Sequence, residues 1–343
     1  MNNVPPKVSI IIPVLNAEGL LENCLRAISE QTYPAAALEI LVPDGGSTDQ
    51  TRAIAARYGA TVLDNPDRVA ESGKRLALKH ATGDYVLFLD ADNELSHRDF
   101  IALAADALAV HPQALGVESY YPANERMSSF CAYLTTTLHI SDPVAWMMSV
   151  APVAVRSVGA VELWRFPDHS LAFPLGANGF MFRRVDLLSV GATEYFEDTA
   201  MVLKLAQRGR CEWLRLTGRG VHHYIVSGLG DFLRKRRRQT YHFLSQRHRT
   251  DRPPSWTTTK PAMPGWLACL ACASLIVPLW QTGRGLIQTG DSRWLWHPLA
   301  SLLSVLGVAW GVLTFLLSER NADAEAMLQP KQKIGDASQS QKE

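Results

Sequence analysis

Short apolar runs alternate with helical patterns over residues 8–94, and this alternation constrains the fold more than any other feature of the sequence. Strand, helix and strand repeated in this order are typical of a doubly wound, mostly parallel α/β sheet. Ligands bind such sheets at the carboxyl ends of the strands. The predicted strands are 8–14, 38–42, 61–63 and 85–89, and the predicted helices between them are 20–28, 52–56 and 71–80.

Two carboxylates, Asp90 and Asp92, follow the last of these strands. Because they stand one residue apart on a turn, both can direct oxygen atoms into one crevice. Hard divalent cations such as Mg²⁺ or Mn²⁺ prefer such oxygen ligands, and a bound cation could bridge a diphosphate. An isolated Asp-x-Asp is more often a simple acidic turn. The metal-site prediction therefore depends on a nucleotide pocket upstream and a catalytic base downstream.

Charge and cysteine content exclude several classes of protein. The formal net charge of the 343 residues is only +1, which argues against general nucleic-acid binding, where a basic excess is expected. The five cysteines are scattered and odd in number, and no secretory signal peptide precedes them, so we expect reduced thiols in a cytosolic setting. Cys269 and Cys272 form a C-x-x-C within an apolar run, but a second ligand pair is lacking.

Two apolar segments, 266–280 and 295–317, lie towards the end of the chain. A bilayer core of about 30 Å needs about 20 apolar residues, so the second segment is long enough and the first is at the short limit. Tryptophans stand at the segment edges, where amphipathic rings prefer the membrane interface: Trp266, Trp280, Trp294 and Trp296. We predict a transmembrane helical hairpin over 265–317 with 281–293 as the outer loop. Two helices lying in the interface of one leaflet are the alternative.

These features divide the chain into four parts. Residues 1–250 form the domain with the candidate site, 251–264 a linker, 265–317 the two transmembrane helices and 318–343 a disordered polar tail. The cationic run 234–238 precedes the hairpin, and lysine and arginine accumulate on the cytoplasmic side of membranes. We therefore expect attachment to the inner cell membrane with the domain on its cytoplasmic face.

Several stretches in the right order resemble the family 2 glycosyltransferases of the GT-A fold. They are 8–18, Gln-Thr-Tyr-Pro at 31–34, Pro-Asp-Gly-Gly-Ser-Thr-Asp at 43–49 and Asp-Ala-Asp at 90–92. The resemblance covers residues 7–235. It implies a GT-A-type doubly wound mixed sheet and an enzyme that transfers sugar with inversion from a nucleotide-diphosphate donor. It also implies a divalent cation, Mn²⁺ or Mg²⁺.

The resemblance implies a donor site formed by Pro13, Asn16, Glu18, Asp44, Lys74 and Asp90. The first three would border the base and ribose, Asp44 would contact the nucleoside, and Asp90 would contact the donor sugar or ribose. Lys74 falls where the family often has a basic residue near the donor, although an exposed helix charge is an equal alternative. Asp92 would ligate the metal directly.

Further along the chain, Asn178 and Gly179 belong to a glycine-rich stretch, 176–184, that is similar to the acceptor-side strand and turn of the family. Glu197 and Asp198 are similar to its Glu-Asp helix start. Inverting transfer in one displacement needs a carboxylate to take the acceptor proton. We assign this role to Asp198 and expect Glu197 to orient hydroxyl groups. Taken alone, an acidic pair at a helix start is usually a cap.

Two adjacent histidines, His222 and His223, precede the basic run much as a metal-ligand histidine does in many members. A neutral imidazole could complete the coordination begun by Asp92, and His223 fits the spacing slightly better, but both stay open. Arg234 or Lys235 could steady the leaving diphosphate.

The chain also departs from the family pattern. No Gln-x-x-Arg-Trp follows the catalytic helix, since 246–249 lacks the tryptophan, so we expect transfer of a single sugar and not polymer synthesis. The predicted acceptor is a lipid-linked or cell-envelope glycan. The alternatives are polyprenyl phosphate as acceptor, a non-catalytic scaffold that binds sugar nucleotides at the membrane, and a nucleotidyltransferase.

Overall fold

The structure is a computed structural model that describes residues 4–138, 142–166, 173–176, 178–245 and 261–328. Its centre is a mixed sheet with strand order β3-β2-β1-β4-β9-β6-β10-β8-β7, in which β5 pairs with β10. The neighbours β3, β2, β1 and β4 are parallel, whereas β9 runs antiparallel to β4. The strands are β1 (Val8–Ile11), β2 (Leu38–Asp44), β3 (Thr61–Asp64), β4 (Tyr85–Phe88), β5 (Asn93–Leu95), β6 (Val117–Tyr120), β7 (Val153–Val158), β8 (Val161–Arg165), β9 (Phe180–Arg183) and β10 (Glu212–His223). This confirms the predicted doubly wound mixed sheet.

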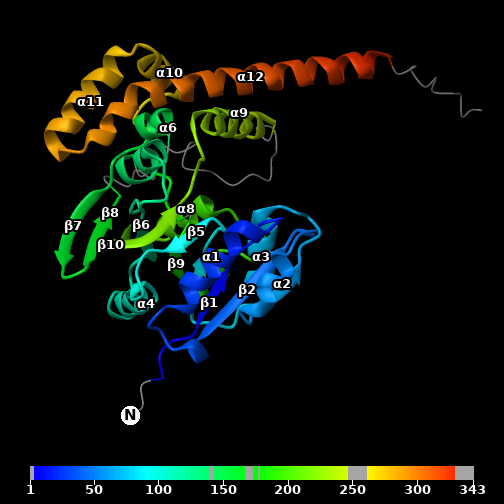
Figure 1. The fold of residues 1–343 in the computed structure, drawn as a ribbon, viewed down its shortest axis with the longest axis vertical. Coiled ribbons are helices and arrows are strands. Elements are labelled where there is room, and N and C mark those ends of the chain that lie inside the picture. Colours follow the sequence, from blue (N-terminus) through cyan, green and yellow to red (C-terminus); the bar gives the residue numbers. More distant parts are fainter. Residues whose placement is uncertain (1–3, 139–141, 167–172, 177, 246–260, 329–343) are drawn as a thin grey trace, which may run out of the picture.

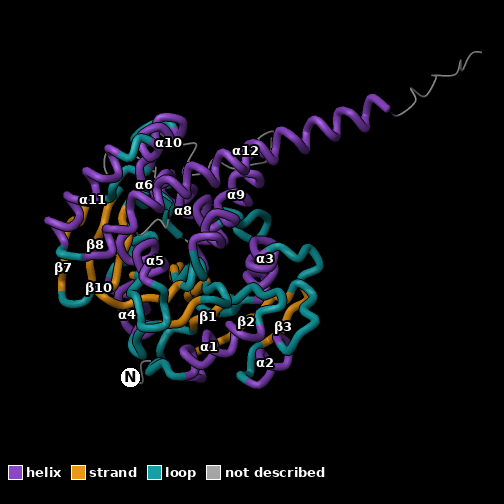
Figure 2. Tube along the Cα trace, turned by 45° about the horizontal axis from the view of Figure 1, so that its top comes forward, coloured by secondary structure: helices purple, strands orange, loops and turns teal. Residues whose placement is uncertain are grey.

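Helices cover both faces of this sheet (Figures 1 and 2). Side chains alternate between the faces of a strand, so Ile10 and Leu87 join one core whereas Ile11 and Phe88 join the other. The first core is closed by α1 (Glu18–Ser29), α2 (Thr51–Arg57) and α4 (Phe100–Val110). The second is closed by α3 (Ala70–His80), α7 (Arg184–Ser189) and α8 (Asp198–Gln207).

The first strand is shorter than predicted. It ends at Ile11 because Pro13 has no backbone N–H to donate to the ladder. Pairing with the neighbouring strand continues around the proline: the N–H of Ile12 donates to the carbonyl of Leu41 at 3.0 Å, and that of Val14 to Pro43 at 3.0 Å. The loop after β1 is therefore held against the end of β2, where the nucleotide site is predicted.

A layer of helices lies over one end of the sheet (Figure 1). Within this layer, the Asp142 carboxylate accepts a hydrogen bond from the N–H of Ala145 and starts the following helix. The elements of this layer are α5 (Ser129–Ala132), the π-helical turn η2 (Tyr133–Thr137), α6 (Pro143–Met148), α9 (Leu229–Ser245), α10 (Gly265–Ala273), α11 (Ile276–Thr289), η5 (Ser292–Trp296) and α12 (His297–Leu328).

The C-terminal prediction needs three corrections. The first apolar segment is two helices, α10 and α11, which are bent by 79° at a break where Leu275 has a φ of 57°. The segment 281–293 is mostly helical, since α11 continues to Thr289. The polar tail does not begin at 318, because the α12 backbone stays helical to Leu328; residues 329–343 lie outside the described part. Residues 319–328 include three alanines, two glutamates, a methionine and a leucine, which are good helix formers, so the backbone helix continues past the apolar stretch.

Among the described residues, Ser292–Ser318 is long and apolar enough to cross a membrane, with a mean hydropathy of 2.1. The bent pair α10–α11 would be a second span only if its two helices are counted together as a single membrane-crossing segment. Two glycines bring α12 against the basic helix α9. A Cβ atom at Gly307 would lie 2.4 Å from Cβ of Arg236, and one at Gly311 would lie 2.7 Å from the carbonyl oxygen of Arg237. The apolar helix and the arginine-rich helix are therefore in direct contact, and α12 extends beyond the end of α9 (Figures 1 and 2).

Candidate active site

Lys74 connects the two acidic motifs that the sequence singles out. It lies on α3 with 4% of its surface exposed. Its Nζ is 2.8 Å from Oδ2 of Asp198 and 3.7 Å from Oδ1 of Asp90. Burial disfavours its charge, but the Asp198 and Asp90 carboxylates outweigh burial and raise the pKa of Lys74. The fold therefore places a permanent cation between the end of β4 and the start of α8.

Asp198 is the first residue of α8, and Glu197 is its N-cap. Oδ2 of Asp198 is bound to Lys74, whereas Oδ1 is buried and accepts no hydrogen bond from any described residue. The side chain as a whole is 19% exposed. Burial raises the pKa of Asp198 to about 6, although Lys74 acts to lower it. A carboxylate with one anchored oxygen and one oxygen that has no hydrogen-bond partner is suited to accept a proton near neutral pH.

Glu197 has a partner of its own. Its Oε1 accepts a hydrogen bond from the Thr199 hydroxyl at 2.9 Å, and the side chain makes no capping hydrogen bond. The pair is therefore not simply a cap, because the Asp198 carboxylate faces Lys74 and not the helix N–H groups.

A second cluster joins Asp92 to His223, the last residue of β10. Oδ2 of Asp92 lies 3.9 Å from Nε2 of His223, and burial with the neighbouring Asp90 carboxylate raises the pKa of Asp92 to about 6. Burial, together with the positive charge of Lys235, lowers the pKa of His223 to about 4, so its ring is neutral at pH 7. The amide of Asn178 lies 3.2 Å from Nε2 of this ring.

The two histidines have different surroundings. His223 is 8% exposed and faces Asp92, whereas Nδ1 of His222 lies 2.8 Å from the carbonyl oxygen of Pro122 on the opposite side of the strand. The geometry thus favours His223 as the partner of Asp92. Among the residues that the structure describes, no group of three or more His, Cys, Asp or Glu side chains is arranged to hold a metal by itself.

The residues predicted to bind the nucleotide lie where the loops after β1 and β2 are hydrogen-bonded to each other. Asn16, at a φ of 49°, accepts a hydrogen bond from the N–H of Thr48 at 2.9 Å, and Glu18 accepts one from the N–H of Gln50 at 2.9 Å. These contacts fix the two loops relative to each other.

Asp44 ends β2 and is 1% exposed. Its carboxylate accepts hydrogen bonds from Ser47 and from Arg52, whose Nη1 lies 2.9 Å away and also binds Asp64 at 2.8 Å. Burial by itself would raise the pKa of Asp44, but the hydrogen bonds from Ser47 and Arg52 outweigh burial and hold this pKa below its usual value. The sequence analysis missed Arg52, although its spacing from Asp44 on the next helix was a usable signal.

Comparison with known proteins agrees with this geometry. Residues 9–124 match the family described as glycosyl transferase family 2. The chain carries a family 2 glycosyltransferase domain. This match confirms the predicted family over residues 9–124.

Individual relatives match other parts of the chain's length. Glycosyltransferase AglE of Haloferax volcanii is 28% identical over 188 residues, which cover 50% of this chain and 60% of the relative. A PGL/p-HBAD biosynthesis glycosyltransferase of Mycobacterium bovis is 34% identical over 112 residues, 31% of this chain and 43% of the relative. The chain thus spans less than two thirds of either relative.

One solved structure is similar over most of the chain. It is the mannosyltransferase PcManGT from Pyrobaculum calidifontis in complex with GDP-Man and Mn²⁺, with a TM-score of 0.53 and 20% identity over 90% of this chain and 88% of that chain. At this identity the likeness shows the shared fold.

The predicted acceptor-side turn contains Gly179. This residue has a φ of 74°, and a Cβ atom there would lie 2.2 Å from Oγ of Ser119. The Ser119 hydroxyl donates to the carbonyl of Gly179 at 2.6 Å, and the N–H of Gly179 donates to the carbonyl of Phe88 at 2.7 Å. Glycine is therefore required to join β9, β6 and the end of β4 beside His223.

Replacing Gly179 with alanine is expected to lower the free energy of unfolding by about 3 kcal/mol, because the left-handed backbone and the contact with Ser119 both become strained. Chemical denaturation of the wild type and the variant measures the difference. Gly228→Ala is the matched control, since its Cβ atom would meet nothing within 4 Å. Equal stability of both variants would contradict this view of the turn.

Proposed function

We propose that this chain transfers one sugar from a nucleotide-diphosphate donor to an acceptor hydroxyl, with inversion at the anomeric carbon. The observation that carries the proposal is the buried Oδ1 of Asp198, which lacks a hydrogen-bond partner while Oδ2 is held by Lys74. A binding scaffold has no use for a carboxylate in this state, since an unpaired buried oxygen costs stability. A general base needs one open oxygen.

The transfer is a single displacement. The acceptor oxygen forms a bond to the anomeric carbon while the bond from that carbon to the diphosphate oxygen breaks. The proton of the acceptor hydroxyl passes to Oδ1 of Asp198, and the nucleoside diphosphate leaves with the bonding electrons. Lys74 keeps Asp198 oriented, and its charge also lies beside Asp90, on the donor side.

The residues present fit a divalent cation. Asp92 offers a carboxylate and His223 a neutral imidazole, and Mn²⁺ accepts both kinds of ligand. Mg²⁺ and Mn²⁺ usually take one or two protein ligands and fill the other positions with phosphate oxygens and water, so a third protein ligand is not required. When bound, the cation would neutralise charge on the leaving diphosphate.

His223→Ala is expected to weaken Mn²⁺ binding by about tenfold or more, because it removes one of the two protein ligands. His222→Ala is the matched control and should leave Mn²⁺ binding unchanged. Titration of free Mn²⁺ by electron paramagnetic resonance, in the presence of UDP or GDP, measures both. The assignment is wrong if His222→Ala weakens binding and His223→Ala does not.

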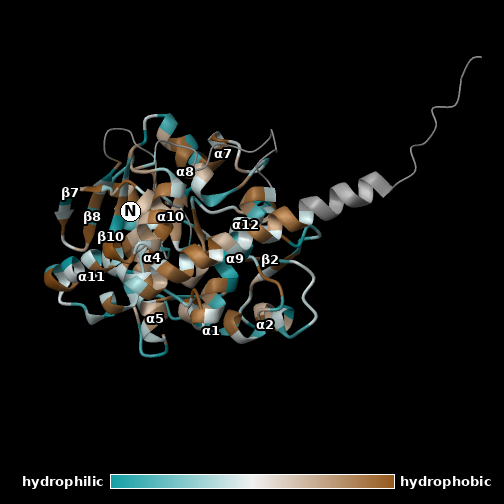
Figure 3. Ribbon diagram, turned by 90° about the horizontal axis from the view of Figure 1, so that it is seen from above, coloured by the Kyte–Doolittle hydropathy of each residue, from teal (hydrophilic) through white to brown (hydrophobic). Residues whose placement is uncertain are grey.

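We further propose that the enzyme works at the cytoplasmic face of the inner cell membrane on a lipid-linked or cell-envelope glycan. Large apolar side chains are exposed on α10–α12, among them Ile276 at 76%, Leu295 at 67% and Trp266 at 67%. Hydrophobic residues run along α11 and the first part of α12 when the molecule is viewed from above (Figure 3). Exposed apolar patches of this kind favour a membrane or protein contact.

The contact between α9 and α12 bears on how these helices meet the membrane. If α12 crossed the bilayer, it would carry the arginine-rich face of α9 into the hydrocarbon, at about 2.5–3.5 kcal/mol for each arginine at the centre. If α12 lies in the interface, the arginines of α9 reach anionic headgroups. The contact therefore favours helices in the interface of one leaflet over the spanning hairpin.

A donor panel tests the proposed activity. Membranes that contain the wild-type enzyme are supplied with labelled UDP-, GDP- and dTDP-sugars, with Mn²⁺ or with chelator, and label is followed in the lipid and glycan fractions. We expect one donor to be consumed and the chelator to stop the reaction. Consumption of no donor would support the scaffold alternative. A sugar phosphodiester as the product would identify polyprenyl phosphate as the acceptor.

A further inference from the structure

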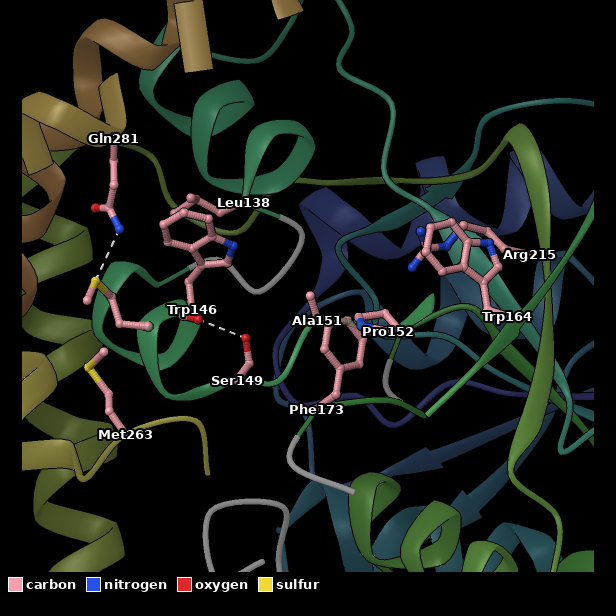
Figure 4. Close-up of a pocket in the computed structure, with 11 residues that line it drawn as sticks. Leu138, Trp146, Ser149, Ala151, Pro152, Trp164, Phe173, Arg215, Met263 and Gln281 are labelled. Carbon is pink, nitrogen blue, oxygen red and sulfur yellow. Dashed lines mark hydrogen bonds between the residues drawn. The ribbon is translucent and has the colours of Figure 1, made fainter. Parts of the chain in front are cut away.

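A cavity of about 490 Å³ lies between the sheet and the helical layer (Figure 4), and none of the predicted donor residues lines it. Its volume falls within the range of small-molecule sites, about 300–1,000 Å³. One side is formed by Trp146, Met147 and Met263, and the other by Trp164 and Phe173. Figure 4 places Ala151 between these two sides.

The cavity has aromatic and methionine walls and a compensated charge. Arg215 lines it with 8% of its surface exposed, but the Nε and Nη2 atoms of Arg215 bind Oε2 of Glu118 at 3.0 and 2.7 Å. Its guanidinium also stacks on Trp164 at 4.5 Å. Since Glu118 neutralises this cation, the cavity has no excess charge to hold a free phosphate, and its walls suit a flexible hydrocarbon chain.

One segment connects the cavity to the catalytic centre. Phe173 lines the cavity, and Gly176, slightly further along the same segment, packs so closely on Asp198 that a Cβ atom would lie 2.8 Å from the backbone carbonyl oxygen of Asp198. The wall formed by Phe173 therefore belongs to the segment that packs against the first residue of α8, the proposed base.

The outer end reaches the helical layer. Nε2 of Gln281, on α11, lies 3.3 Å from the sulfur of Met147, and both residues line the cavity (Figure 4). The next residue along α11 towards its start is Trp280, which is 62% exposed. The cavity therefore lies between the proposed membrane-facing surface and the segment that packs on Asp198.

We propose that this cavity binds the hydrocarbon chain of a lipid phosphate-linked acceptor, and that it draws the hydroxyl to be glycosylated from the membrane surface towards Asp198. The proposal rests on the proposed function, which supplies the acceptor. It assigns the lipid to a defined set of walls and leaves the donor site, around Asn16 and Asp90, on the other side of Lys74.

Photolabelling of the full chain tests the proposal without any sugar donor. The probe is farnesyl phosphate with a diazirine on its terminal isoprene unit, and labelled peptides are mapped by mass spectrometry. We expect label on peptides that contain Trp146, Met147 or Met263. Ala151→Trp fills the cavity and should reduce this label at least tenfold. Val155→Trp, on an exposed position of β7, is the matched control and should leave the label unchanged.

Label confined to the exposed faces of α10–α12, or equal label in wild type and Ala151→Trp, would overturn the proposal. Thermal unfolding of both tryptophan variants confirms that they are folded. The outcome is separate from the donor panel: a labelled cavity in a chain that consumes no donor keeps the lipid site and rejects the transferase function. Sugar transfer without labelling of the cavity keeps the transferase function and rejects the lipid site.

Discussion

Asp198→Asn is expected to lower kcat about 10³-fold, within the contribution of about 10²–10⁴ that general base catalysis makes. Asparagine has nearly the same shape and keeps a carbonyl oxygen for Lys74, but its side chain does not accept a proton at neutral pH. Donor binding should change little, because the substitution leaves the β1 and β2 loops untouched. Steady-state rates and nucleotide binding, measured on the same preparation, separate the two effects.

The matched control is Glu71→Gln. Glu71 is an exposed residue of α3 whose negative charge also acts on Lys74 and Asp198. The Glu71→Gln substitution removes a nearby carboxylate charge but keeps Oδ1 of Asp198, so kcat should stay within about twofold of the wild type. If both variants lose the same activity, the loss arises from the local field and Asp198 is not the base.

Lys74→Met is expected to lower the free energy of unfolding at pH 8 by about 3–5 kcal/mol, the usual cost of removing one member of a buried ion pair. Methionine fills a similar volume but leaves the Asp198 carboxylate without its partner. Lys79→Met, on an exposed position of the same helix, is the matched control and should change stability little. Chemical denaturation of both variants measures the difference.

The loss of stability in Lys74→Met should be larger at pH 8 than at pH 5. The pKa of Asp198 is already raised to about 6 in the folded chain by burial, against the opposing effect of Lys74. Without Lys74 this pKa rises further, so at pH 5 the folded state holds a neutral carboxyl group and the destabilisation is smaller than at pH 8. The acid limb of kcat/KM should likewise move from about pH 6 to higher pH. An equal loss of stability at both values would contradict the ion-pair account.

The sequence predicted the order and type of the elements well where a motif coincided with a strand end. Asp90 and Asp92 follow β4, Asp44 is the last residue of β2, and the topology brings these ends to one edge of the sheet. The pairing of Lys74 with Asp198 was not predictable in this way, since the two residues are 124 positions apart and meet only because β9 inserts antiparallel beside β4. Long-range contacts of this kind leave no local pattern.

The helical layer shows a second limit. Hydropathy identified the apolar segments, but it gave no signal for the bend at Leu275, since leucine rarely adopts a positive φ. Nor did it predict that Gly307 and Gly311 would bring α12 against α9. Both features depend on tertiary packing. The sequence also did not predict the full set of walls of the proposed lipid cavity, because they combine segments as distant as Trp146, Trp164 and Met263.

The anomeric configuration of the product is the most direct test of the central claim, that Asp198 supports a single displacement. Once the donor panel has named a donor, the wild-type product is analysed by proton NMR for the coupling constant at the new linkage. The account predicts inversion, so that an α-linked donor yields a β-linked product. Retention of configuration would require a second displacement or a different mechanism, and would contradict the role assigned to Asp198.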